Sequence, residues 1–388
     1  MGRFWLMVLA LLTAFVPAAF AQAEYDIHVL LPLTGGAAFI GNSMKTAMSL
    51  AENQINNEGF LPNTRLKLVF HDDQSSPQVG VQLAQEILQS NPAIVFGSAI
   101  SAICNAVGPV MTQTVLYCLS PGIHPSAGSN IFSAGGSSTN YVKALFRFFQ
   151  GRHWTRIAVL TTTDASGQDA DAAIAQFSRD QDSQSIVAYE HMTPTDVTVS
   201  AQIEKIKAAK PDALIVWATG SAISTVYRGL VQAGFDMPVA ASPSTMIYTQ
   251  MLQYTNFLPK ELYFSTPDWV AQGSPSVENP KVQKQQTLFF EAMKSVGAIP
   301  DAASETVWDP TRIVAGLLKK LGPKASAAAL REGIASTSDF VGIDGVYDFK
   351  RSPQRGLDVS NTVIARWDAQ AKYWRVVSKP GGEPVSVP

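Results

Sequence analysis

Strand-like and helix-like segments alternate along most of this chain, and the alternation restricts the fold more than any other feature of the sequence. Short apolar runs at residues 27–31 and 115–119 are each preceded or followed by a loop and a stretch with helical spacing. Strands separated by helical segments predict βαβ units, which form parallel sheets covered by helices. The pattern restarts after a polar segment at residues 133–140, with a helix at 141–150 followed by a strand at 156–160. Two such series predict two α/β lobes, each with a doubly wound parallel sheet.

The helical segments are predicted from apolar spacing and from the residues that begin them. Residues 43–57 place apolar side chains on one face, and Pro77 opens a second helix that extends to residue 89. The tail is less regular, with helices expected at residues 283–296, 304–321 and 326–335. Two apolar segments, residues 346–349 and 359–367, predict a β-hairpin or two adjacent strands around a turn at Ser352 and Pro353.

Residues 1–23 have the features of a secretory leader. Arg3 precedes an apolar run that ends at Pro17, and small residues at 19, 21 and 23 fit the A-x-A cleavage rule. The run is shorter than the roughly 20 residues that span a bilayer, although an N-terminal membrane anchor stays open as the alternative. We therefore expect a soluble mature protein in the periplasm, with no lipid anchor because no Cys lies near the cleavage site.

Composition excludes several classes of protein and narrows the role of the two cysteines. Apolar residues make up 46% of the chain, charged residues only 15%, and no basic run is present, so we expect no nucleic-acid partner. Cys104 and Cys118 are close in sequence, and in an oxidising compartment such a pair forms a disulfide. Two separately buried thiols are the alternative. Two cysteines without clustered histidines do not fill a tetrahedral metal site, so no metal is expected.

Catalytic motifs are absent from the sequence. The five histidines form no H-E-x-x-H pair, and there is no G-x-S-x-G elbow, P-loop or G-x-G-x-x-G fingerprint. Asp72 and Asp73 follow a strand, and we expect a solvated strand end there, with a cation site as the alternative. The predicted strand ends carry Ser, Gly, Thr and apolar residues, which suit binding and not catalysis. We therefore expect a binding protein that is not an enzyme and has no cofactor. An extracytoplasmic hydrolase would need a nucleophile–base pair, which the strand ends lack.

Two loops at predicted strand ends are the best candidates for ligand contact, because ligands of open α/β sheets bind at the carboxyl ends of strands. Ser101 stands between a strand and a helix and offers a hydroxyl and an amide. Gly122, in the next loop, lets the backbone approach a ligand closely. A plain helix N-cap is the alternative role for Ser101, and an exposed loop residue is the alternative for His124, two positions after Gly122.

In the order and spacing of its motifs, the mature chain resembles the type I periplasmic solute-binding proteins, the family of the leucine-isoleucine-valine-binding protein. The similar segments are residues 31–35, 51–56, 70–74, 97–101, 120–122, 156–160 and 203–217. The resemblance implies two lobes that are joined by a three-strand hinge and close on a small ligand. It places lobe one at residues 24–141 plus 270–338 and lobe two at 142–269 plus 339–388. It also implies a monomer that delivers its ligand to an ABC permease and its ATPase.

The resemblance also implies a set of ligand-binding residues. In amino-acid-binding relatives, a Ser at the position of Ser101 takes the ligand carboxylate, assisted at the positions of Gly122 and His124. In the relatives an aromatic residue usually follows the first loop, and Phe39 stands near that place. Two tyrosines of the relatives' second lobe correspond to Ser166 and to the vicinity of Thr219 in this chain. The full expected set is Phe39, Ile100, Ser101, Gly122, Ile123, His124, Ser166, Thr219, Ser244 and Trp308.

The main departure from the family concerns the partner of a ligand ammonium. The relatives hold the ammonium with a Glu, where this chain has Ser244. A buried ammonium without a charged partner is costly to desolvate, so Ser244 argues against an amino acid. We therefore expect a carboxylate ligand without an amine, an aromatic acid, with Trp308 and Phe39 as flat walls. Trp308 in the core, a branched-chain or other amino acid as ligand, and a periplasmic sensory module as function are the alternatives.

Overall fold

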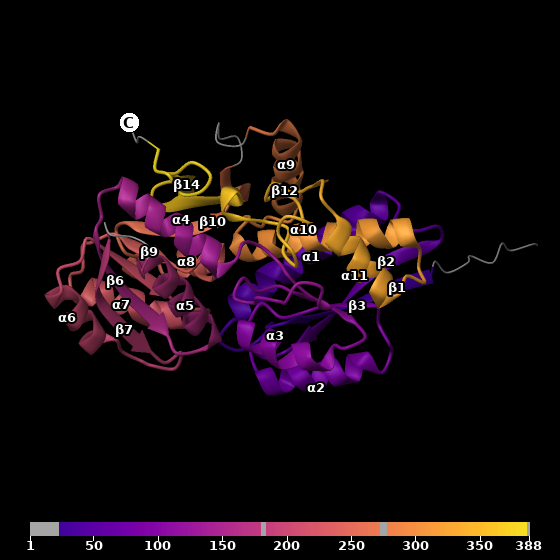
Figure 1. Cartoon of the computed structure of the whole chain (residues 1–388), viewed down its shortest axis with the longest axis horizontal. Helices are drawn as coiled ribbons and strands as arrows, with labels where there is room; N and C mark the ends of the chain where they lie inside the picture. Colours follow the sequence, from indigo (N-terminus) through magenta and orange to yellow (C-terminus); the bar gives the residue numbers. More distant parts are fainter. Residues whose placement is uncertain (1–22, 180–183, 272–277, 386–388) are drawn as a thin grey trace, which may run out of the picture.

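The computed structural model of the chain describes residues 23–179, 184–271 and 278–385. It contains two separate, mainly parallel sheets covered by helices, which lie in two lobes seen at the lower right and the left of Figure 1. The predicted α/β fold is therefore confirmed. The expected leader lies outside the described residues, apart from Ala23, with which the first strand begins. Among the described residues, no helix is long and apolar enough to cross a membrane.

The first lobe is built around a five-stranded parallel sheet in the order β2-β1-β3-β4-β5. Its central strands are buried on both faces: Val29 and Leu31 face one apolar cluster, and Leu30 faces another. Helix α1 (Ala38–Asn57) packs on one face, and α2 (Pro77–Leu88) and α3 (Ser101–Val107) cover the other. The strands are β1 (Ala23–Leu31), β2 (Thr64–Asp72), β3 (Ile94–Phe96), β4 (Val115–Cys118) and β5 (Ile131–Ser133).

The second lobe is built around a seven-stranded sheet in the order β14-β13-β10-β9-β8-β6-β7. Its β13 and β14 run antiparallel to their neighbours, whereas the remaining pairings are parallel. Helices α4 (Ser138–Gly151) and α5 (Ala165–Arg179) cover one face, and α6 (Ser200–Ala208) and α7 (Ala222–Gln232) cover the other. The strands are β6 (Arg156–Thr162), β7 (Ser185–Met192), β8 (Ala213–Trp217), β9 (Val239–Ala241), β10 (Leu262–Pro267), β13 (Thr362–Asp368) and β14 (Tyr373–Val376).

Three connections carry the chain between the two sheets, at β5 to α4, β10 to α9, and α11 to β13. Helix α10 packs beside α1, so a late segment completes the first lobe, as the resemblance implies. The exact lobe boundaries stay a prediction. The remaining elements are the helices α8 (Tyr248–Gln253), α9 (Pro280–Ser295), α10 (Ala302–Leu321) and α11 (Ala327–Ser336), the strands β11 (Phe340–Val341) and β12 (Val346–Tyr347), and five short 3-10 turns.

The structure corrects two local predictions. The expected hairpin between residues 346–349 and 359–367 is wrong, because β12 pairs with β11 and β13 pairs with β10 and β14. Apolar alternation marked both segments as strands but contained no information about their partners. Helix α1 begins at Ala38 rather than at Ser43, because the loop from Pro32 closes earlier and Ile40 already packs against the sheet.

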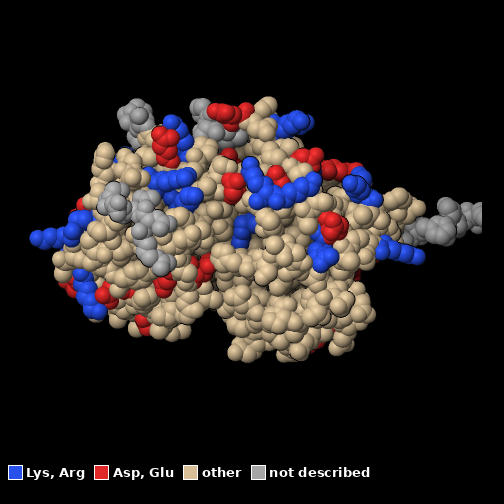
Figure 2. Space-filling model, in the orientation of Figure 1, with Lys and Arg blue, Asp and Glu red and all other residues tan. Residues whose placement is uncertain are grey.

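Charged side chains are unevenly distributed over the face drawn in Figure 2. The lower part of the first lobe, where Figure 1 places α2 and α3, is almost free of Lys, Arg, Asp and Glu. In the sequence, Glu86 is the single such residue between Asp73 and Lys143. A notch in the space-filling surface separates this part from the second lobe. Loops at the carboxyl ends of strands of both lobes line one small cavity.

Candidate ligand-binding site

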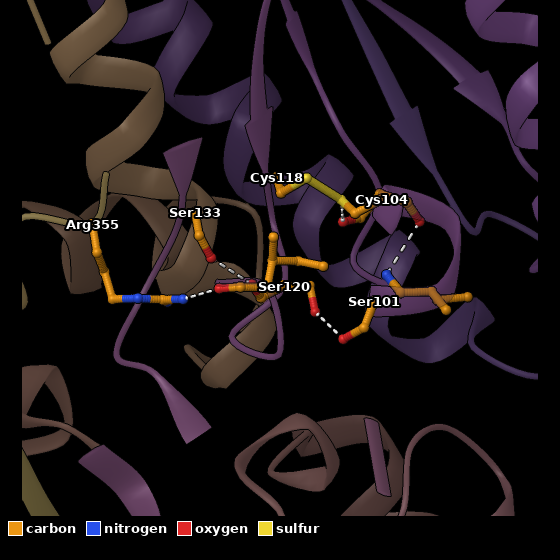
Figure 3. The surroundings of a disulfide bond; sticks show 9 residues. Ser101, Cys104, Cys118, Ser120, Ser133 and Arg355 are labelled. Carbon is orange, nitrogen blue, oxygen red and sulfur yellow. Dashed lines mark hydrogen bonds between the residues drawn. A yellow bond between two sulfur atoms is a disulfide. The ribbon is translucent and has the colours of Figure 1, made fainter. Parts of the chain in front are cut away.

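Two serine hydroxyls meet at the edge of the first lobe that faces the second. Ser101 is the first residue of α3, and Ser120 follows β4; their Oγ atoms lie 2.7 Å apart, and both residues are buried. Ile100 occupies the N-cap position of α3 and makes no side-chain cap bond, so the hydroxyl of Ser101 is not used for capping. Figure 3 shows the two serines side by side at the strand ends. Both side chains are thus placed to hydrogen-bond a ligand in the cleft.

The disulfide between Cys104 and Cys118 holds these two serines in place, and the predicted pairing is confirmed. Cys104 lies one helical turn after Ser101, and Cys118 ends β4 two residues before Ser120. The bond therefore joins the first turns of α3 to the end of β4 (Figure 3). Both cysteines are buried, so the bond lies beneath the site and not in contact with solvent.

Glycine is required at position 122 because the loop after β4 passes directly over Ser101. A Cβ atom at Gly122 would lie 2.5 Å from Ser101 Oγ and 3.2 Å from Asp169 Oδ2, a carboxylate of the second lobe. The first distance is closer than non-bonded atoms approach, so any side chain would displace the hydroxyl of Ser101. The next residue, Ile123, points into the core and supports the loop from below. Gly122 thus allows the loop to lie in close contact with both Ser101 and Asp169.

A buried arginine that the sequence did not single out fixes these loops. Arg355 donates hydrogen bonds to five carbonyl oxygens, those of Pro121, Ile123, Ala134, Gly135 and Gly136. Burial lowers the pKa of Arg355 to about 10, which leaves the guanidinium charged at neutral pH. A buried charge is costly unless it is hydrogen-bonded, and here the carbonyls supply that compensation. Arg355 thus ties the loop after β4 to the connection between β5 and α4 (Figure 3).

His124 contacts the second lobe directly. Its Nε2 atom lies 2.5 Å from Oδ1 of Asp169, which belongs to helix α5. The other oxygen of that carboxylate, Oδ2, is buried and has no hydrogen-bond partner among the described residues. Asp169 therefore brings a negative charge to the same place as Ser101 and Gly122. The sequence offered no signal for Asp169, which lies in a helix without any recognisable motif.

The second lobe faces Ser101 with a group of hydroxyls. Thr219 lies 3.1 Å from Ser166 and 3.5 Å from Ser244 between their hydroxyl oxygens, and Ser242 lies 2.6 Å from Ser244. These residues line a cavity of about 20 Å³ together with Ile100, Ser101 and Ser120. The structure thus brings Ser166, Thr219 and Ser244 together with Ser101. This part of the cavity wall contains no charged side chain except Asp164, whose carboxylate accepts bonds from Thr162 and from the Gly167 amide.

A second cavity of about 30 Å³ adjoins the first, since Ala99, Pro121 and Ser244 line both. Its wall is mainly apolar and includes Ile40, Met44, Leu119, Ile247 and Tyr141. Glu305, on α10, is the acidic residue in this wall. Burial raises the pKa of Glu305 to about 8, and burial together with the neighbouring carboxylates, Glu305 first, raises the pKa of Asp344. Two neighbouring buried carboxyl groups disfavour each other's ionisation, so Glu305 and Asp344 together carry less than their full charge at neutral pH.

The two expected aromatic walls lie elsewhere. Trp308 is 1% exposed and packs in the core against Phe289, with ring centroids 5.0 Å apart, so the structure favours the alternative role for Trp308. Phe39 lines a separate, mostly apolar cavity of about 460 Å³ together with Tyr248, between α1 and α8. Ile40, its neighbour, lines the cleft instead. Among the described residues, no group of three or more His, Cys, Asp or Glu side chains is arranged to hold a metal ion.

Comparison with known proteins identifies a family for most of the chain. The sequence profile described as periplasmic binding protein matches residues 24–372. The chain is 26% identical over 199 residues to Leu/Ile/Val-binding protein homolog 3 of Brucella melitensis, over 50% of this chain and 54% of that protein. It is 24% identical over 206 residues to Leu/Ile/Val-binding protein BraC3 of Rhizobium johnstonii, over 51% and 55%. The chain thus spans about half the length of the curated relatives it matches.

Several solved structures share the fold of this chain over nearly its whole length. An extracellular ligand-binding receptor from Rhodopseudomonas palustris HaA2 superposes with a TM-score of 0.78 at 16% identity, covering 92% of this chain and 100% of that one. A solute-binding protein of an R. palustris ABC transporter in complex with benzoate gives 0.75 at 15% identity, covering 92% and 96%. The protein LivJ of Streptococcus pneumoniae in complex with isoleucine gives 0.75 at 18% identity, covering 91% and 99%. These likenesses show the fold.

Proposed function

The chain belongs to the periplasmic binding protein family, and from this premise we propose that it is the solute-binding component of an ABC importer. We infer that it captures a small carboxylate-bearing ligand between its two lobes and delivers it to a permease and its ATPase. The family is one of binding proteins and not of enzymes. The observation that carries the proposal is the buried pair of hydroxyls, Ser101 and Ser120, at the cleft between the lobes.

Ligand entry requires the lobes to separate. The two cavities in the cleft measure about 20 and 30 Å³, which is enough for a water molecule or two each. Small-molecule sites commonly measure roughly 300 Å³ or more. A ligand therefore fits only when the second lobe swings away from Ser101, and closure then surrounds the ligand with residues of both lobes.

We propose an aromatic acid as the ligand. Its carboxylate would accept hydrogen bonds from the hydroxyls of Ser101 and Ser120, and its ring would occupy the apolar cavity lined by Ile40, Met44 and Leu119. Ser244 supports this class, because its position offers only a hydroxyl and no charge for an ammonium. A neighbour in fold that is known in complex with benzoate is consistent with the same chemistry.

A branched-chain amino acid is the second candidate, and Asp169 favours it. Its Oδ2 atom is buried beside Gly122 without a partner in the described part of the chain, and a buried acceptor left unpaired costs roughly 1–3 kcal/mol. A ligand ammonium would supply the missing donor and a compensating charge. The curated relatives are named as Leu/Ile/Val-binding proteins, and a neighbour in fold is known with isoleucine. A sensory module that presents its ligand to a membrane receptor would use the same cleft.

Isothermal titration calorimetry with hydroxybenzoates, phenylpropanoid acids and leucine tests the proposal. We expect an aromatic acid to bind and Ser101→Ala to weaken binding by roughly tenfold or more, because a hydrogen bond to a charged group contributes about 1.5–3 kcal/mol. Ser336→Ala, at an exposed serine of α11, is the matched control and should bind like the original chain. Tight leucine binding without any response to aromatic acids would refute the ligand class, and unchanged affinity of Ser101→Ala would refute the site.

A further inference from the structure

A larger cavity lies in the second lobe, away from the cleft. It has a volume of about 660 Å³ and lies where the end of α4, the start of β10 and the turn between β13 and β14 meet. This volume is within the usual range for small-molecule sites, unlike the cavities in the cleft. Its wall combines cationic and aromatic side chains, which are Phe148, Arg152, Lys260, Tyr263, Arg366 and Arg375.

Two arginines stand directly opposite each other in this wall. Arg366 of β13 pairs in register with Arg375 of β14, and on its other side with Tyr263 of β10. Residues paired in register point to the same face of a sheet, so the three side chains form one row. Like charges directly opposite on neighbouring strands destabilise a sheet. An anion placed between the two guanidinium groups would remove that repulsion.

The acidic residues nearby compensate these charges only in part. Asp368 pairs with Arg375, at 2.5 Å between Oδ2 and Nε. Glu261 approaches Arg366 only to 3.9 Å, and the Nε atom of Arg366 is buried without any acceptor in the part of the chain that the structure describes. Arg152 adds a further positive charge to the wall, whereas Lys260 is paired with Asp236, at 2.7 Å between Nζ and Oδ1. Among the described residues, Asp368 is the one acidic residue that lines the wall. The cavity therefore carries an excess of positive charge in a chain whose formal net charge is −2.

The floor of the cavity is aromatic. The rings of Phe148 and Tyr263 lie with their centroids 5.5 Å apart, and Leu258 lines the same wall. The guanidinium of Arg366 lies over the ring of Tyr263, at 5.8 Å from its centroid. A planar apolar group is accommodated beside such rings, and its negative substituent would then reach the arginines.

We propose that this cavity is a second binding site, which takes a small organic anion with a flat apolar body and holds its charged group between Arg366 and Arg375. Two observations point to an anionic ligand: the opposed arginine pair, and the excess of cationic over acidic side chains among the described residues of the wall. The aromatic floor specifies the flat body. The site does not depend on the ligand of the cleft, because none of its wall residues lines the cavities at Ser101.

Calorimetry with naphthalene-1,5-disulfonate at low salt tests this site. We expect one bound probe per chain, and binding that weakens as sodium chloride is added because the interaction is ionic. Arg366→Gln and Arg375→Gln should each weaken binding of the probe by about tenfold or more, since each removes a charge-assisted hydrogen bond. Arg351→Gln is the matched control, an exposed arginine with an aspartate partner outside the cavity, and should bind like the original chain.

A further comparison separates the two sites. The Ser101→Ala variant should bind the probe with unchanged affinity. The Arg366→Gln variant should bind the ligand of the cleft with unchanged affinity, and its circular dichroism spectrum should also be unchanged. Arg375→Gln serves as the second variant because Arg375 is more exposed than Arg366 and its replacement is the safer one for folding. The proposal is overturned if the probe at millimolar concentration shows no binding, or if both arginine variants bind it like the original chain.

Discussion

Reduction of the Cys104–Cys118 disulfide should weaken both the fold and the ligand site. The bond joins α3 to the end of β4, and these two elements carry Ser101 and Ser120, whose hydroxyls lie 2.7 Å apart. Without the bond, the two serines are held together by packing, by their own hydrogen bond and by the hydrogen bonds of Arg355 and Ser133 to the loop after β4. We therefore expect reduced protein to bind its ligand more weakly, even under conditions where it stays folded.

The expected loss of stability follows from the size of the loop. The cysteines are separated by 14 residues in sequence, and closing a loop of this size contributes about 3 kcal/mol in the chain-entropy model. Unfolding entropies of roughly 2.1 cal/mol/K per residue give about 0.8 kcal/mol/K for a chain of this length. Dividing the first figure by the second predicts that the melting temperature falls by about 4 °C on reduction.

Differential scanning calorimetry with and without dithiothreitol measures this effect, and titration of the same samples with ligand measures the effect on binding. The Cys104→Ala/Cys118→Ala double variant is the control, because its melting temperature should not respond to dithiothreitol. Reduction that is verified by thiol titration but leaves both the melting temperature and the affinity unchanged would contradict the reasoning.

Three further predictions concern single residues of the cleft. Gly122→Ala should lower ligand affinity by at least about tenfold in calorimetry, because its Cβ atom would displace the hydroxyl of Ser101, and unchanged affinity would contradict that geometry. Asp169→Asn should strengthen binding of aromatic acids and weaken binding of amino acids, because it removes a negative charge beside Ser101; equal effects on both classes would argue against a role in specificity. Burial raises the pKa of Glu305 to about 8 in the folded chain from 4.5, so the folded state binds more protons than the unfolded state between these values. The contribution of Glu305 to stability is then complete below about pH 4.5 and is lost as pH rises towards 8, and Glu305→Gln should become more stable relative to the original chain between pH 5 and 8. Thermal melts at both pH values test this against Glu332→Gln, at an exposed position, and a difference that does not change with pH would contradict it.

The parts of the structure that the sequence predicted depend on local patterns. Apolar runs identified β1, β3 and β4, and the position of Ser101 between a strand and a helix placed it at the cleft edge. Gly122 was singled out for its freedom to let backbone approach closely, and the structure shows the close approach, to Ser101. The disulfide followed from the redox compartment. Each of these inferences needed only a short stretch of chain or a compositional argument.

The residues that the sequence missed act through contacts between distant segments. Arg355 and Pro121 are 234 positions apart, and Asp169 and His124 are 45 apart. Glu305 reads as an ordinary residue in the first turns of a helix, and only the fold places it against Asp344 inside the protein. No periodicity or motif specifies which loop a side chain will meet. Trp308 shows the same limit, since the helix pattern did not reveal which of its faces is buried.

The contacts between the lobes also set how readily the cleft opens. Besides the pair of His124 and Asp169, the Ser221 amide donates to the carbonyl of Gly36 at 3.0 Å, and the Tyr248 amide donates to Asp301 Oδ2 at 3.1 Å. Hydrogen bonds of this kind contribute about 0.5–1.5 kcal/mol each, so breaking these three contacts costs roughly 1.5–4.5 kcal/mol. An open form at this free energy is a minority species that still admits ligand. The free energy of opening is subtracted from the binding free energy that the open form alone would give. A ligand of this protein must therefore gain more free energy from its contacts with the two lobes than the lobes gain from their direct contacts with each other.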